Sequence, residues 1–510
     1  MKPSRGRARL AAILLVCGIV AAAYRPVLGD QALSLDDDDF VVRNPLVTHP
    51  GWSSAGRFFA ELLRPSSVPG YAVPLTMTSL MLDWAAGGRP GNLFAFHRTN
   101  LALHLACVAL VVLILELLSG SLAAAAIAGL LFGLHPLTVE PVAWITERKT
   151  LLAACFGFAS VLGYLYACRS GSRIARALSL GAYLLALLSK PTVLTLPLLL
   201  VVLDLWPLRR PGTRRSRVRR ALIEKWPYFV LALAFGAISK LSLDRTLVVP
   251  ELARPDPSSW AWQIGWTLAF EVSKLAWPGP LATVYEPPRP FALSNPLVLA
   301  GVLAVLALTV VLAARARSWP GPLAGWAFFV LALVPTFRPV NNAWIVAADR
   351  YLYFPALGIL MVAAAGLAAV LARWPHAGAR ATLAVAVGAL VTLEARATPA
   401  TLGNWSDSLT HFRHLVAVAP HSPVLRDDLG SRWLEAGKYD EAIAEYRRVL
   451  GINPNLAQAR YGLAQALDRS SRRREAREEY ARFLEIWNRA DPDVPLLLEA
   501  KRRLAALATD

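Results

Sequence analysis

Long apolar segments recur along the first 400 residues of this chain, and they constrain its fold more than any other feature. Of the 510 residues, 55% are hydrophobic and 17% are charged, whereas a soluble domain carries about 25% charged residues. In hydrocarbon, the backbone amides of a crossing segment must be hydrogen-bonded within the segment, which favours helices. The sequence therefore predicts an all-α, polytopic membrane domain.

Arginines and lysines beside the apolar segments predict how the chain threads the membrane. The basic start MKPSRGRAR and the arginine-rich loop 209–220 are expected in the cytoplasm. About eleven spans follow, at residues 10–28, 98–118, 121–138, 150–168, 177–189, 192–207, 223–241, 296–314, 322–337, 351–372 and 380–396. In a plasma (inner) membrane, the N-terminus is then cytoplasmic, and the long loops lie outside at 29–97, 135–149, 242–295 and 338–350.

One further apolar segment, residues 260–277, has two interpretations. It contains Glu271 and Lys274 and is rich in tryptophan. If it crosses the membrane, the basic loops after it fall outside; if it lies in the interface, they fall inside. Tryptophan favours the membrane–water interface, so we expect an interfacial helix.

The formal net charge of +18 does not indicate a nucleic-acid-binding protein. Much of the positive charge lies in short loops beside apolar segments, where it sets topology, so we expect no nucleic-acid partner. The four cysteines lie in or beside apolar segments and form no CxxC pair. We therefore expect neither a disulfide framework nor a cysteine metal site.

The last part of the chain, from about residue 401, is polar and repeats with a period of 34. The matched pairs are Pro420 and Pro454, Leu429 and Leu463, Ala442 and Ala476, Tyr446 and Tyr480, and Leu450 and Leu484. This period is typical of tetratricopeptide helix pairs. The sequence predicts a membrane domain at 1–400 and a short α-solenoid at 401–510, with one half and two whole repeats.

Polar residues concentrate in the predicted outer loops. They are Asp36, Asp37, Asp38, Asp39, Asn44, His135, Glu140, Glu147, Arg148, Lys149, Lys190, Tyr285, Glu286, Asp349, Arg350 and Tyr353. Ionisable residues at membrane depth are functional candidates, and their shared side suggests one site.

Two kinds of chemistry suit this group. A carboxylate can accept a proton from an attacking hydroxyl, while Lys or Arg can hold a phosphate. The pair suits sugar transfer from a polyprenyl-phosphate carrier. Asp36 and Asp37 could instead hold a divalent cation, and a solvated loop without a chemical role is the simplest alternative.

Several of these stretches together resemble a known family. They are DDDDFVVRNPLV, FHRTNLALHL, LFGLHPLTVEPVAWITERKTLL, SKPTVLTLPLLLVVLDLWPL, WPGPLATVYEP and ADRYLYFPALG, followed by the repeats. In this order the chain resembles bacterial relatives of the transmembrane and tetratricopeptide-repeat-containing O-mannosyltransferases, which are GT-C glycosyltransferases. The resemblance implies a helical core of many spans with an extracytoplasmic active site.

The resemblance also implies roles for particular residues. The family's acidic motif falls on Asp36 and Asp37, and Asp37 is the expected catalytic base, with Asp36 and Asp38 as substitutes. His135, Glu140 and Arg148 are expected in the second loop of the site. Arg350 and Lys190 are expected at the donor phosphate, with Tyr353 beside them as a substrate-binding residue.

The predicted function is transfer of a sugar, which in this family is mannose, from a polyprenyl-phosphate carrier to a hydroxyl. The acceptor is expected to be Ser or Thr of an exported protein, held by the repeats outside the cell. Two alternatives have other chemistry: a membrane-anchored repeat scaffold without catalysis, and a lipid or sugar transporter.

Overall fold

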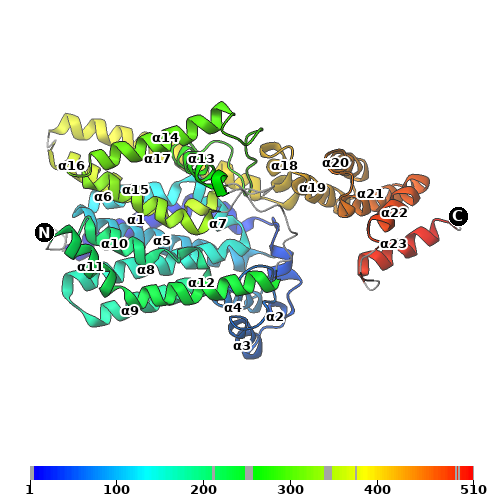
Figure 1. Cartoon of the computed structure of the whole chain (residues 1–510), viewed down its shortest axis with the longest axis horizontal. Coiled ribbons are helices and arrows are strands. Elements are labelled where there is room, and N and C mark those ends of the chain that lie inside the picture. The colour runs from blue at the N-terminus through cyan, green and yellow to red at the C-terminus, as the bar shows by residue number, and fades with distance from the viewer. Residues whose placement is uncertain are drawn as a thin grey trace. The chain divides into compact units, whose positions relative to one another are not determined.

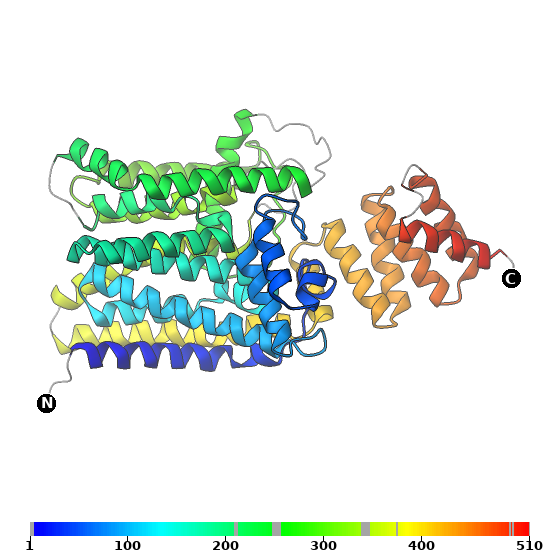
Figure 2. The same cartoon turned by 90° about the horizontal axis from the view of Figure 1, so that it is seen from below.

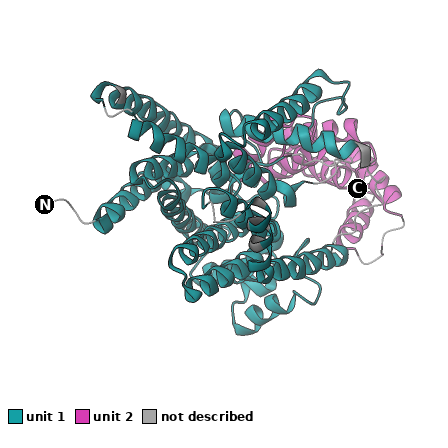
Figure 3. Ribbon diagram, turned by 60° about the vertical axis from the view of Figure 1, so that its left-hand side comes forward, with its two compact units in different colours: residues 1–283, 287–406 teal, residues 284–286, 407–510 magenta. Residues whose placement is uncertain are grey.

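The computed structural model describes residues 5–208, 213–246, 257–337, 347–373, 376–488, 491 and 494–508. These residues form helices and turns, and they contain no β-strand beyond an isolated bridge between Arg89 and Asn92. The chain divides into two units, one of residues 1–283 and 287–406 and one of residues 284–286 and 407–510 (Figure 3). The division falls six residues after the boundary predicted at 400/401.

The first unit is a helical bundle (Figures 1 and 2). Its longer helices are α1 (Arg5–Tyr24), α5 (Phe94–Ser119), α6 (Leu122–Leu134), α8 (Arg148–Ser170), α9 (Arg173–Ser189), α10 (Leu196–Leu205), α11 (Arg214–Glu224), α12 (Trp226–Thr246), α13 (Pro257–Ala276), α14 (Pro296–Ala314), α15 (Pro320–Leu333), α16 (Ala356–Arg373) and α17 (Ala377–Leu402). The all-helical membrane fold is confirmed.

Among the residues that the structure describes, seven helical segments are long and apolar enough to cross a membrane. They lie at Arg5–Gly29, Phe94–Ser119, Ile145–Ser170, Trp226–Thr246, Pro296–Ala314, Ala356–Arg373 and Arg380–Trp405. The other predicted spans are helical but shorter or broken, at Leu122–Leu134 with Pro136–Ala143, α9, Pro191–Leu205 and Pro320–Thr336. The count of eleven spans therefore stays a prediction.

Residues 209–212 of the arginine-rich loop lie outside the described residues, and so do 247–256 and 338–346 of two predicted outer loops. Helix α13 covers most of the segment 260–277, which the sequence allows to be either a membrane span or an interfacial helix. It has 20 residues but is not among the helices apolar enough to cross.

Small residues allow the bundle helices to approach closely. A Cβ added to Gly325 on α15 would lie 2.6 Å from the carbonyl oxygen of Gly358 on α16. Close backbone approach at small residues is a common way to pack helices in a membrane.

Residues 30–93, before α5, are folded over the helix ends. They form the short helices α2 (Pro45–Thr48), α3 (Trp52–Ala60) and α4 (Pro74–Ala85). Their own apolar core contains Phe40, Val47, Phe58, Met77 and Leu80, together with Phe96 of α5 and Ile145. This core fixes the aspartate run, residues 36–39, against the bundle.

The second unit consists of α18 (Ser408–Val418), α19 (Pro423–Glu435), α20 (Tyr439–Ile452), α21 (Ala457–Arg469), α22 (Arg473–Ile486) and α23 (Pro495–Ala506). The predicted repeat structure is confirmed, and α23 adds a helix beyond the two and a half repeats that we expected. The helices pack closely at glycines, because a Cβ added to Gly430 or to Gly462 would lie 2.9 or 2.4 Å from the ring of Tyr446.

Candidate active site

The four aspartates of the run have different environments. Asp36 is half-exposed, with 44% of its side chain accessible, and its Oδ2 lies 2.9 Å from Lys149 Nζ. Asp38 pairs with Arg43 at 3.2 Å near the surface, and Asp39 is exposed. The run is therefore not a uniform acidic surface.

Asp37 is the buried member of the run. Its side chain is 0% exposed. The backbone N–H of Ser34 donates to Oδ2 at 2.9 Å, and that of Thr146 donates to Oδ1 at 3.1 Å. Burial raises the pKa of Asp37 to about 7, and the hydrogen bonds from Ser34 and Thr146 limit the rise. This carboxyl joins two loops and does not face solvent.

Glu147 lies at the centre of a cluster of cations. It ends the short turn η4 (Ile145–Glu147) before α8. Its carboxylate oxygens lie 3.3 Å from Lys149 Nζ, 3.0 Å from Lys190 Nζ and 3.4 Å from Arg350 Nε. Lys190 Nζ also donates to Thr150 Oγ1 at 2.7 Å. One carboxylate thus holds three cations from three separate parts of the chain.

Arg350 is held by a second carboxylate. It lies in the turn η7 (Asp349–Leu352), where its backbone N–H donates to Glu140 Oε2 at 2.8 Å and its Nη1 donates to Glu140 Oε1 at 2.5 Å. The guanidinium also lies over the ring of Trp144, 5.2 Å from its centroid. Arg350 and Lys190 line a small cavity of about 20 Å³, which is roughly the space of one water molecule.

Helix geometry places Glu140 in this cluster. Proline has no N–H to continue a helix, and α6 ends before Pro136 with a 58° bend. His135 caps the following turn, and its Nδ1 accepts from Leu137 N at 3.3 Å. The short helix α7 (Val139–Ala143) then presents Glu140 to Arg350.

We call the residues joined in this way the charge network: Asp36, Glu140, Glu147, Lys149, Lys190 and Arg350. It contains three carboxylates and three cations. Buried charges are costly unless they are paired, and here each has a partner. An anion that entered the network would compete with Glu140 and Glu147 for cations that are already in place.

Arg148, which is predicted to bind the donor, lies in a separate set of buried contacts. This side chain is 0% exposed and lies outside the charge network. Its Nε donates to Asn100 Oδ1 at 2.8 Å, its Nη2 donates to the Phe96 carbonyl at 2.7 Å, and its Nη1 pairs with Asp83. Arg148 therefore ties α4 and α5 to α8, and its contact with the donor stays a prediction.

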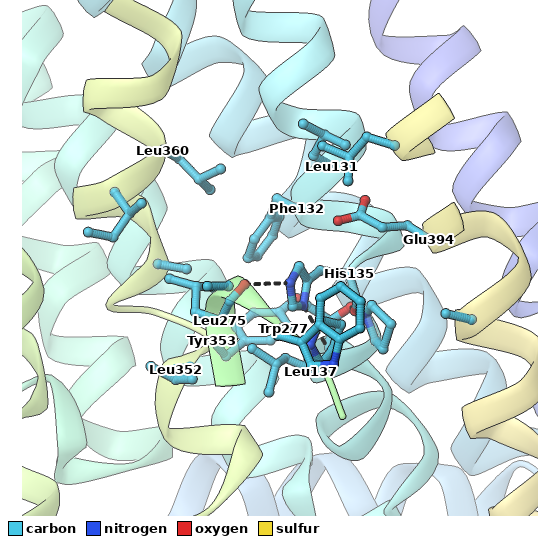
Figure 4. A pocket seen from close by; sticks show the side chains of 18 of the residues that line it. Leu131, Phe132, His135, Leu137, Leu275, Trp277, Leu352, Tyr353, Leu360 and Glu394 are labelled. Carbon is cyan, nitrogen blue, oxygen red and sulfur yellow. Dashed lines mark hydrogen bonds between the residues drawn. The ribbon is translucent and has the colours of Figure 1, made fainter. Parts of the chain in front are cut away.

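His135 and Tyr353 line a different space from the charge network. Both border a cavity of about 470 Å³ between α6, α13, α16 and α17, the apolar cavity (Figure 4). His135 Nε2 lies 3.1 Å from the Leu275 carbonyl, and Tyr353 Oη lies 2.7 Å from His104 Nδ1. The other lining side chains are mainly apolar, among them Leu131, Phe132, Leu360 and Leu393.

The aspartate run does not fit a divalent cation. The Lys149 ammonium pairs with Asp36 Oδ2, and the backbone amides of two residues donate hydrogen bonds to the carboxylate oxygens of Asp37. Within the described part of the chain, no three His, Cys, Asp or Glu side chains are grouped to hold a metal ion.

The sequence placed Glu147 and Lys149 in the polar group without giving either a role. Their order in the segment ERK, just before an apolar helix, shows only that they lie near its start. That Glu147 faces Lys190 and Arg350 depends on the packing of three distant segments.

Comparison with known proteins gives two results. A family model described as TPR repeat matches residues 430–469. Among curated proteins, the chain is 28% identical over 246 residues to protein O-mannosyl-transferase Tmtc2 of Drosophila melanogaster, covering 46% of this chain and 25% of that protein.

Two further relatives are similar. Protein O-mannosyl-transferase TMTC1 of Mus musculus is 29% identical over 163 residues, covering 32% of this chain and 17% of the relative. Tmtc1 of Drosophila melanogaster is 28% identical over 152 residues, covering 29% and 17%. The chain is a distant relative of these O-mannosyl-transferases. The matched part of the chain spans a quarter or less of each relative's length.

Proposed function

We propose that this membrane protein is a glycosyltransferase that moves a sugar from a polyprenyl-phosphate carrier to a hydroxyl of a protein. The observation that supports this most is the charge network, which places an accessible carboxylate beside cations suited to a phosphate. The relatives are named protein O-mannosyl-transferases, which makes mannose the sugar to test first.

The proposed base is Asp36 rather than Asp37. A general base must come within hydrogen-bond reach of the hydroxyl that it deprotonates. Asp37 is fully buried, and both of its oxygens accept backbone hydrogen bonds. Asp36 combines an accessible side chain with contact to the charge network. Asp38 is accessible too, but it pairs with Arg43 instead.

In the proposed reaction, Asp36 takes the proton of the acceptor hydroxyl as its oxygen bonds to the anomeric carbon of the sugar. The bond between that carbon and the phosphate oxygen breaks, and its electron pair leaves with the phosphate. Lys190 and Arg350 stabilise the negative charge on the departing polyprenyl phosphate. Glu147 positions both cations before the donor arrives.

The apolar cavity supports a lipid-linked donor. Its lining includes Leu352 and Tyr353, which lie two and three residues after Arg350 in the chain. An isoprenoid chain in this cavity would therefore run close to a phosphate held at Arg350. His135 and Tyr353 would then be walls of the chain site rather than ligands of the phosphate.

For the whole protein, we propose an extracytoplasmic active site and a repeat unit that holds the acceptor, an exported protein with Ser or Thr. A scaffold needs only an anchor in the membrane, and it gains nothing from six charges gathered in one network. A transporter would move the donor between leaflets without breaking the bond to the sugar, so product formation separates it from a transferase.

The test is transfer of labelled mannose from polyprenyl-phosphate mannose to a threonine-containing acceptor protein by the full chain in liposomes. We expect Asp36→Asn to lower the rate about 10²-fold or more, which is typical of losing a general base. Arg350→Ala should also lower it. Asp39→Asn is the matched control, because Asp39 is an exposed acid of the same run. A folded Asp36→Asn variant with the normal rate would overturn the role of Asp36.

A further inference from the structure

Helix α3 carries an exposed apolar stripe that nothing above explains. Trp52 is 94% exposed, Phe59 42% and Leu63, just after the helix, 76%. Trp52 and Phe59 are seven residues apart and so lie on one side of α3, and Leu63 follows in the turn after the helix. We call these three residues the apolar stripe. Large apolar groups that stay exposed together mark a surface that binds something.

The opposite side of α3 is firmly held. Phe58 is fully buried in the core of the segment 30–93. Ser54 Oγ donates to the His49 carbonyl at 2.9 Å, and Glu61 accepts a hydrogen bond from Ser66 at 3.1 Å. The helix therefore cannot turn the apolar stripe inward without losing these contacts.

Hydrogen bonds to α12 fix the depth of this segment. Arg245 Nη1 donates to the Leu63 carbonyl at 3.0 Å. Thr246 Oγ1 and Ser242 Oγ donate to the Gly70 carbonyl at 2.7 and 2.9 Å. These three residues form the last turn of a helix apolar enough to cross a membrane. The segment that carries the apolar stripe is thus fixed to the end of α12, where that helix would leave the hydrocarbon, and α3 lies at the edge of the helical unit (Figure 1).

Basic residues accompany the apolar stripe. Arg64, which follows Leu63 in the chain, is exposed, and Arg57 of α3 is half-buried and donates to the Pro65 carbonyl at 3.1 Å. Tryptophan and arginine together are typical of a segment at lipid headgroup level. Arginines near a bilayer surface also attract anionic lipids.

We propose that α3 is an interfacial helix whose apolar stripe inserts into the same bilayer that the bundle crosses. The partner is the boundary between lipid headgroups and acyl chains, with anionic headgroups beside the arginines. Since α3 and the aspartate run share one apolar core, this contact would hold Asp36 at a set height above the lipid. The binding itself does not depend on the proposed transfer activity.

The experiment uses the full chain in lipid nanodiscs with a bimane fluorophore at residue 52. The Trp52→Cys variant is labelled, and the signal of the labelled parent chain, which keeps its four native cysteines, is subtracted. Phe59→Cys gives a second position on the apolar stripe. Arg474→Cys is the aqueous control, since the Arg474 side chain is 92% exposed in the second unit.

We expect the bimane emission at residues 52 and 59 to be blue-shifted and to be quenched by lipids brominated near the headgroup, while residue 474 shows neither effect. Anionic phosphatidylglycerol nanodiscs should give a larger shift than phosphatidylcholine nanodiscs. Emission at residue 52 equal to that at 474 would overturn the proposal. So would a shift that appears only when a second copy or an acceptor protein is added, because the apolar stripe would then bind protein.

Discussion

Adjacent residues of the aspartate run have different chemistry because their surroundings differ. Asp36 reaches solvent and Lys149, while Asp37 is enclosed by Ser34 and Thr146. An enclosed carboxyl with few counter-charges favours its neutral form. Asp37 therefore serves to join two loops, and Asp36 remains available for an acceptor hydroxyl.

The buried carboxyl of Asp37 predicts a pH-dependent stability. Its pKa is raised to about 7, whereas the pKa of an aspartate in an unfolded chain is about 3.9. The folded state thus binds this proton more tightly. The resulting stabilisation is complete below pH about 4 and is lost as the pH rises through about 7. We expect Asp37→Asn to remove this contribution, so its melting temperature should depend less on pH than that of the wild type.

The measurement is tryptophan fluorescence during heating of the full chain in detergent, from pH 5 to 8. Asp39→Asn is again the control, since Asp39 is exposed in the same run. The same slope of melting temperature against pH in the wild type and in Asp37→Asn would contradict the role of Asp37.

At the scale of helices, α20 and α21 of the second unit pack closely at Gly462. A Cβ added to Gly462 would lie 2.4 Å from the ring of Tyr446, so one of the two helices must move. Tyr446 is itself buried, and its hydroxyl pairs with Ser431 at 3.1 Å. The tyrosine therefore has little freedom to give way.

We expect Gly462→Ala to destabilise the second unit by about 1–3 kcal/mol, as overpacking usually does. Gly451→Ala is the matched control, because a Cβ there meets nothing within 4 Å and alanine favours a helix by roughly 1 kcal/mol. Hydrogen exchange of the α20 and α21 peptides in the full chain measures both effects. Equal protection in the two variants would show that the contact with Tyr446 does not limit stability.

At the scale of the whole molecule, the distribution of arginines predicts which side of the membrane each loop occupies. We expect Asp39→Cys to react with an impermeant maleimide in intact cells, and Arg315→Cys to react only after permeabilisation. Both positions are exposed. The second result would show that α13 does not cross, because a crossing α13 would place residue 315 outside. Labelling of residue 39 only after permeabilisation would contradict the proposed sidedness.

The sequence by itself determined the helical membrane unit, the repeat unit and the set of polar residues from which the charge network is drawn. Hydropathy over single segments predicts the membrane helices, and the spacing of residues along the chain predicts the repeats. Both patterns are local in the sequence. The 34-residue period identified Tyr446 and Tyr480 as equivalent, and both are buried in the repeats.

Only the tertiary structure decided which charges meet. Arg148 and Lys149 are neighbours in sequence, yet they begin a helix and so point in different directions: Arg148 pairs with Asp83, and Lys149 with Asp36 and Glu147. In the same way, only packing showed that Asp37 is enclosed and that Glu147 holds Lys190 and Arg350. Partners this distant in sequence are set by how helices rotate and pack against one another, and no local pattern of residues records that rotation.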